Sequence, residues 1–174
     1  MEKITYNGKE YMRNGMKWFD SSYVVVHQTL QDELNKLYIQ SIDLTQMDVD
    51  AVVLEGDRYK QTRSFGLAIR CYEEAASRCD ADTMSCILPR ITSCYRGINA
   101  PERAIELFAF AKRRYGAGIM NPALLTSAAA AYCDMRQYDN ARKCCKRAYA
   151  MCNGRASEEL KSVFGRIKKE CGEE

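Results

Sequence analysis

Three alanines spaced 36 and 37 residues apart constrain the fold of this 174-residue chain more than any other feature. Ala68, Ala104 and Ala141 hold the same place in three successive segments. Tyrosines and further alanines recur at matching offsets, and these are Tyr59, Tyr95 and Tyr132 with Ala75, Ala111 and Ala148. A period of this length is typical of a helical-hairpin repeat. Each hairpin has an apolar face that it cannot bury alone, so the three units are expected to stack.

The residue types at the recurring positions suit close helix packing. Gly56, Thr92 and Ala129 stand at equivalent places, where a small residue lets the two helices of a hairpin approach. The tyrosine three residues later fills the space beside this close approach. The alanine pair of the second helix admits the next hairpin into its groove.

These residues resemble the tetratricopeptide repeat family over residues 48–154. The first segment matches all six positions compared, which are Gly56, Tyr59, Phe65, Ala68, Tyr72 and Ala75. The chain departs from the pattern at Pro101, where the family prefers an aromatic residue, and at Cys145, where a bulky residue is usual. Its periods also exceed the family's usual length of about 34 residues. A related helical-hairpin solenoid therefore remains an alternative.

The two ends of the chain differ from the repeats. Asn7-Gly8 and Asn14-Gly15 favour hairpin turns, so the first twenty residues predict a two- or three-stranded meander. A helix is expected from Ser22 to about Gln40, with Tyr23 and Val26 on its apolar face. Residues 24–26 could instead finish a strand. We expect residues 1–47 to pack against one end of the array.

Helix-start signals mark the later repeats and the C-terminus. Asn99 and Asn121 are predicted caps of helices that begin with proline. Ser157 is a predicted cap of a terminal helix within residues 155–174. Its apolar stripe faces the last hairpin, and Arg166 lies among the cations of the other side. The predicted fold is thus all-α, an α-α superhelix of three hairpins with a C-terminal capping helix, preceded by a small β-meander and a helix in one compact domain.

The sequence offers little chemistry for catalysis. It contains no phosphate-binding loop, zinc-protease motif or serine-hydrolase motif, and His27 is its only histidine. Its nine cysteines include no C-x-x-C pair of the kind that zinc sites use. Most fall within helical patterns, where cysteine acts as a small apolar residue. We predict a noncatalytic protein without a cofactor or a metal, and a thiol-based sensor is the weaker alternative.

The resemblance implies that the first helix of each hairpin lines a concave face that holds a peptide. By position, the predicted lining is Val53, Asp57, Lys60, Arg90, Ser93, Arg96, Thr126, Ser127, Ala130 and Asp134, together with Cys86 and Cys133. Arg90 and Arg96 suit a ligand carboxylate or phosphate. The alternative is that both are solvated or pair with acids of the chain itself.

A protein or peptide partner is the favoured prediction. Family members that grip chaperone tails carry lysine, arginine or asparagine at positions that are Val53, Asp57, Ala123 and Ser127 here, so a chaperone-tail adaptor is not expected. Self-association is also plausible for so short an array. No membrane partner is indicated, and a cytoplasmic location is expected.

Charge is unevenly distributed along the chain. Residues 101–174 hold fourteen Lys or Arg against nine Asp or Glu. This surplus leaves a nucleic-acid-associated protein as the alternative function. A solvated surface is the favoured interpretation, because the basic segments show no interleaved aromatic residues and no recognised nucleic-acid module is present.

Overall fold

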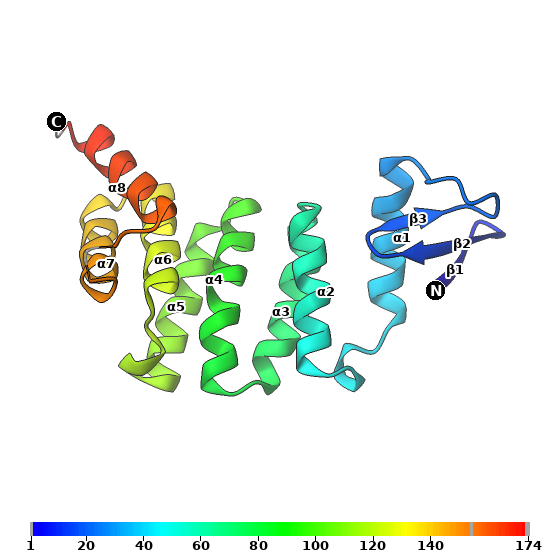
Figure 1. Cartoon of the computed structure of the whole chain (residues 1–174), viewed down its shortest axis with the longest axis horizontal. Coiled ribbons are helices and arrows are strands. Elements are labelled where there is room, and N and C mark those ends of the chain that lie inside the picture. Colours follow the sequence, from blue (N-terminus) through cyan, green and yellow to red (C-terminus); the bar gives the residue numbers. More distant parts are fainter. Residues whose placement is uncertain (1, 154, 173–174) are drawn as a thin grey trace.

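The structure is an elongated array of helices with a small sheet at its N-terminal end (Figure 1). It is a computed structural model that describes residues 2–153 and 155–172. The strands are β1 (Glu2–Tyr6), β2 (Lys9–Asn14) and β3 (Lys17–Phe19). The helices are α1 (Gln28–Ser41), α2 (Val49–Gln61), α3 (Phe65–Arg78), α4 (Ala81–Gly97), α5 (Pro101–Tyr115), α6 (Pro122–Asp134), α7 (Tyr138–Met151) and α8 (Glu158–Cys171), with short 3-10 turns at Leu44–Gln46 and Ala117–Ile119. The predicted fold class is confirmed.

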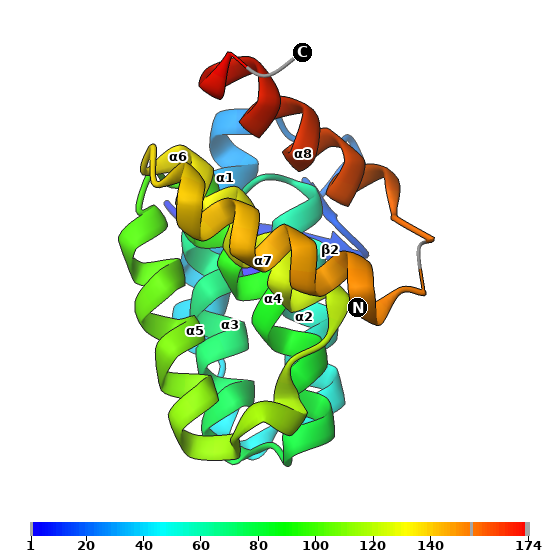
Figure 2. The ribbon, with the colours of Figure 1, turned by 90° about the vertical axis from the view of Figure 1, so that its left-hand side faces the viewer.

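Three helical hairpins form the body of the array. The pairs are α2 with α3, α4 with α5, and α6 with α7. The first helices α2 and α4 lie in one layer and the second helices α3 and α5 in the other (Figure 2). The repeated alanines Ala68, Ala104 and Ala141 are fully buried, as their spacing predicts. No helix in the described part of the chain is both long and apolar enough to cross a bilayer.

The small residue at the start of the repeat pattern has a clear steric role. A Cβ atom added to Gly56 would lie 2.7 Å from Cε1 of Tyr72, which belongs to the facing helix α3. Real Cβ atoms do not come that close, so only glycine lets α2 and α3 approach to this distance. The predicted reason for a small residue here is confirmed.

Two predicted helix caps are confirmed, at the starts of α6 and α8. The Asn121 side chain accepts a hydrogen bond from the Leu124 amide at 2.8 Å, and Ser157 caps α8 in the same manner. The predicted cap at Asn99 is wrong. Ala100 occupies the N-cap position of α5, while Asn99 takes the left-handed conformation, with φ of 57°, in the turn after α4.

The N-terminal strands form an antiparallel meander in the order β1-β2-β3, as the two Asn-Gly pairs predict. The predicted start of the next helix at Ser22 is wrong, because α1 begins at Gln28. Asp20 accepts hydrogen bonds from the amides of Ser22 and Val24 and so stabilises a turn. His27 caps α1 through Nδ1, which accepts from the Leu30 amide at 3.4 Å.

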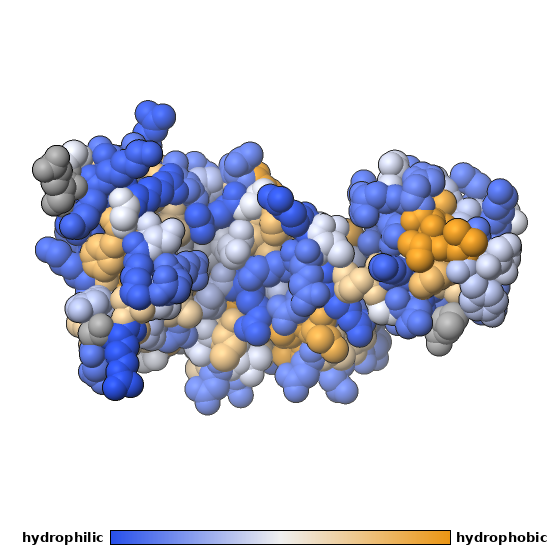
Figure 3. Space-filling view, turned by 45° about the horizontal axis from the view of Figure 1, so that its top comes forward, coloured by the Kyte–Doolittle hydropathy of each residue, from blue (hydrophilic) through white to orange (hydrophobic). Residues whose placement is uncertain are grey.

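A short bridging segment follows this turn and leads into α1. Val25 forms a single bridge with Phe19, which agrees with the strand alternative for residues 24–26. Tyr23 does not lie on a helix face and is strongly exposed, as are Val24 and Val25. Figure 3 shows apolar side chains gathered on this N-terminal unit.

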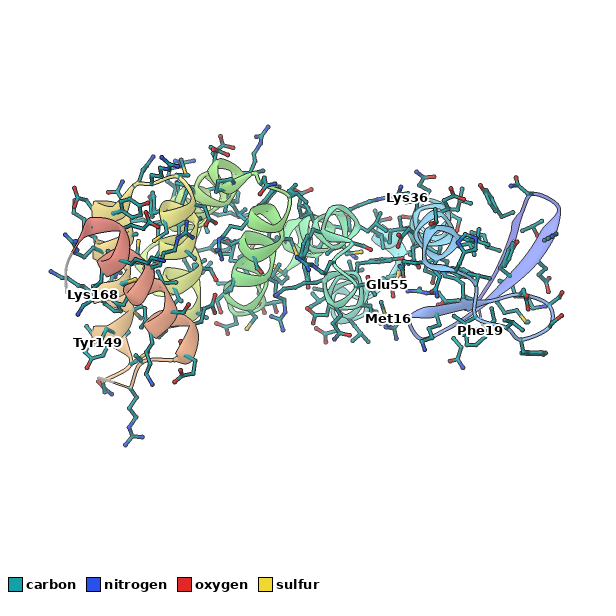
Figure 4. All side chains as sticks on the ribbon, turned by 90° about the horizontal axis from the view of Figure 1, so that it is seen from above. Met16, Phe19, Lys36, Glu55, Tyr149 and Lys168 are labelled. Atoms are coloured by element: carbon teal, nitrogen blue, oxygen red, sulfur yellow. The ribbon has the colours of Figure 1, made fainter. Side chains whose placement is uncertain are left out.

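A buried ion pair joins the N-terminal unit to the array. Arg13 of β2 donates from one terminal nitrogen to Oε1 of Glu55 on α2 at 2.6 Å. The Arg13 guanidinium also lies 4.5 Å from the ring centre of Tyr38 on α1. Figure 4 shows Glu55 on the side of α2 that faces α1 and the strands. The unit therefore covers the first end of the array.

The C-terminal helix covers the other end. α8 contacts both α6 and α7, as α6 contacts both α4 and α5. Leu160, Val163 and Ile167 of α8 are buried in one cluster with Ala129 and Ala141. The predicted apolar stripe is thus confirmed, and α8 stands where the first helix of another repeat would stand.

Candidate functional site

The first helices of the three hairpins and α8 line a groove with two adjoining cavities. One cavity of about 690 Å³ lies among α4, α6, α8 and the start of α5. The other, of about 590 Å³, lies among α2, α4, α6 and α8. Ser93 of α4 lines both cavities, so the two form one continuous depression. This depression lies along the first helices of the hairpins.

An ion pair fixes the wall between the first two hairpins. Nε of Arg90 donates to Oδ1 of Asp57 at 3.0 Å, and the hydroxyl of Tyr72 donates to the same oxygen at 2.5 Å. Burial, reinforced by the bond to Asp57, raises the pKa of Tyr72. Another nitrogen of Arg90 donates to the carbonyl of Cys86 at 2.6 Å. Arg90 is therefore held by the chain's own acceptors, across two repeats.

A second ionic cluster lies at the far end of the groove. Asp134, at the end of α6, accepts from Nε of Arg96 at 2.6 Å and from a terminal nitrogen of Arg166 at 2.5 Å. Burial acts to raise the pKa of Asp134, but the two arginines outweigh it and hold that pKa below its usual value. The cluster joins α4, α6 and α8, so it fixes the C-terminal helix beside the groove.

The structure brings many of the predicted binding residues together. Six of the ten line the two cavities, and these are Lys60, Arg90, Ser93, Arg96, Ser127 and Asp134. Cys86 also lines one of them. Asp57 contributes indirectly by holding Arg90, and Val53 packs half-buried against the core.

Three of the predicted lining residues are wrong. Thr126, Ala130 and Cys133 are buried and offer no surface to a partner. The hydroxyl of Thr126 donates to the carbonyl of Pro122 at 2.7 Å, within its own helix. Ala130 and Cys133 belong to the apolar cluster that α8 completes. The expected exposure fails because α8 packs against the last hairpin.

Two groove residues of α8 were not among the predicted lining residues. Arg166 and Glu159 line the cavities, although the sequence suggested only a solvated outer face for this helix. The prediction for Arg166 is corrected by its hydrogen bonds to Asp134 and to the carbonyl of Cys133. The signal that would have found them is the apolar stripe of α8, since a helix stacked like a fourth first helix must present one polar side to the groove.

Three of the buried cysteines are unsuited to nucleophilic chemistry. Burial raises the pKa of Cys71 and Cys145 to about 12 and that of Cys94 to about 11. These three thiols are therefore protonated at neutral pH and are poor nucleophiles. No group of three or more metal-ligating side chains converges in the part of the chain that the structure covers.

Comparisons with known proteins agree with the repeat architecture. A scan against protein families and a search of curated protein sequences found no match. Among solved structures, the Sgt2 tetratricopeptide domain from Aspergillus fumigatus is similar at a TM-score of 0.63 and 19% identity, over 72% of this chain and 80% of that one.

Two further structures have the same form. The tetratricopeptide domain of Arabidopsis OM64 has a TM-score of 0.60 and 13% identity, over 74% of this chain and 99% of that one. The TPR2B domain of yeast Sti1, solved in complex with pHsp70, has a TM-score of 0.59 and 16% identity, over 70% of this chain and 97% of that one. At such identities the likeness speaks for the fold. The chain therefore has the fold of a tetratricopeptide-repeat array.

Proposed function

We propose that this protein is a noncatalytic scaffold that binds an extended segment of a partner protein along the groove of α2, α4, α6 and α8. The observation that carries the proposal is the continuity of the two cavities through Ser93. Together they have room for several peptide residues, because ligand pockets typically measure about 300–1,000 Å³.

The charges of the groove favour a partner of mixed polarity. Arg90 and Arg96 are each held by an aspartate of the chain. Lys60 and Glu159 line the same cavity and form no ion pair among the described residues. A lysine and a glutamate free to pair suit a segment that carries both an acidic and a basic side chain. The chaperone peptides bound by similar domains end in acidic residues, as in the first domain of Spaghetti with the HSP90 peptide SRMEEVD, so a different ligand is proposed here.

Peptide display on the full chain tests the proposal. Enriched peptides are synthesised with a fluorescent label, and their affinities are measured by anisotropy against the wild type and Ser93→Trp. The tryptophan fills the point where the cavities meet, so binding is expected to fall at least tenfold. Ser77→Trp is the matched control, since Ser77 is exposed on α3, outside the groove. Equal losses in both variants, or full binding by Ser93→Trp, would refute the groove assignment.

A further inference from the structure

A second charged surface lies on the second helices of the last two hairpins. Five cations define it, and we call it the basic ridge: Lys112, Arg113, Lys143, Lys146 and Arg147, from the end of α5 and from α7. All five are exposed. None forms an ion pair within the described residues, whereas the arginines of the groove are neutralised by aspartates. The ridge therefore carries uncompensated positive charge.

Cations of both helices act on one group, the thiol of Cys144. The half-buried thiol of Cys144 on α7 lies within electrostatic range of Arg147 and of Lys112 on α5. Burial raises the pKa of Cys144, and the two cations oppose that rise. Both helices are second helices of their hairpins, and none of the five cations lines either groove cavity, so the ridge is separate from the groove.

Exposed aromatic rings adjoin the ridge on both helices. Phe110 is 42% exposed and stands three residues before Arg113, while Tyr149 is 46% exposed and stands three residues after Lys146. Residues three apart are neighbours on a helix surface. Figure 4 shows Tyr149 on the outer side of α7, at the end of the array. Cations beside exposed rings are the combination that holds a phosphate backbone while bases stack.

We propose that the basic ridge binds single-stranded nucleic acid through its phosphates, with Phe110 and Tyr149 as stacking surfaces for bases. An acidic polypeptide has matching charge but gains little from the rings. The inference is independent of the peptide groove, because it uses neither the cavities nor their residues.

Salt dependence gives the expected magnitude. If each of the five cations meets one phosphate, affinity for a single strand should fall about 100-fold between 50 and 200 mM salt. Removing three of these contacts should reduce the same fall to about sevenfold. The slope of log affinity against log salt concentration therefore reports the number of phosphate contacts and does not depend on the absolute affinity.

The experiment measures anisotropy of a labelled oligouridylate with the full chain at both salt concentrations. The test variant is Lys112→Gln with Lys143→Gln and Arg147→Gln. The control variant is Lys9→Gln with Lys17→Gln and Lys36→Gln, which removes three exposed lysines from the N-terminal unit. Both take the net charge from +3 to zero, so only the place of the charge differs. The test variant should bind more weakly and depend less on salt, while the control should keep the salt dependence of the wild type.

Three further outcomes decide the partner class. Phe110→Ala and Tyr149→Ala should each weaken binding at least about fivefold if the rings stack on bases. An unchanged affinity in both would overturn the proposal. Displacement of the oligonucleotide by polyglutamate at equal charge concentration would assign the ridge to an acidic polypeptide instead. An equal loss of affinity in the two triple variants would show that binding depends on net charge alone and would overturn the proposal.

Discussion

Replacement of Arg13 by methionine should destabilise the chain strongly, because it leaves a buried carboxylate with a weaker partner. The side chain of Arg13 is 0% exposed and that of Glu55 is 4% exposed. After the change Glu55 keeps only Arg58, at 2.9 Å, whose side chain is 37% exposed. Removal of one partner of a buried pair typically costs about 3–5 kcal/mol. For a chain of this length that corresponds to a fall in Tm of about 6–20 °C.

Unfolding of the Arg13→Met variant should begin at the N-terminal unit. Arg13 joins this unit to α2, so its removal is expected to free β1–β3 and α1 before the hairpins open. Hydrogen exchange should therefore accelerate in residues 2–41 and remain slow in α4–α7. Urea unfolding and differential scanning calorimetry supply the global stability.

Two companion variants separate the causes. Arg103→Met removes an exposed pair with Glu106 and should cost less than about 1 kcal/mol. Arg13→Met with Glu55→Leu removes both buried charges and should recover most of the loss. A cost below about 1 kcal/mol for Arg13→Met, or a double variant no more stable than the single one, would refute this account of the junction.

Three more changes probe other parts of the array. Gly56→Ala should cost about 1–3 kcal/mol in urea unfolding because its Cβ would collide with Tyr72, whereas Gly66→Ala, where nothing lies within 4 Å, should be neutral or slightly stabilising. Asp134→Asn should be less stable than the wild type at pH 7. The difference should shrink as the pH falls below about 4, because a carboxylate with a lowered pKa stabilises the fold only while ionised, and thermal unfolding from pH 2 to 7 measures it. Asn121→Ala should cost about 1 kcal/mol through the loss of the α6 cap, and an unchanged Tm would contradict that role.

The repeat spacing predicts the hairpins well because the repeated positions are those where helices pack against each other. Ala68 and Ala104 are buried where the period places them, and Gly56 meets Tyr72 as the close approach requires. The start of α1 was not predictable from its apolar spacing. There, hydrogen bonds from local amides to Asp20 outweigh a helical pattern that begins at Tyr23. The extent of the three units proposed as residues 1–47, 48–154 and 155–174 stays a prediction.

The groove was predictable only in part, for a different reason. Positions such as Lys60 and Arg96 follow from the repeat, because equivalent residues of stacked hairpins share a face. The contribution of Arg166 does not, since α8 lies outside the repeat pattern and its orientation depends on tertiary packing. The same packing buries Ala130, which a repeat-based prediction leaves exposed.

The placement of α8 also decides how this array can be lengthened by design. α8 already packs like the first helix of a fourth repeat. An extension joined after Cys171 must therefore start with the second helix of that repeat. A complete repeat inserted before Glu158 would instead have to present its own residues to Leu160 and Ile167, which now pack on α6 and α7. The first route keeps the existing interface, and the second requires it to be rebuilt.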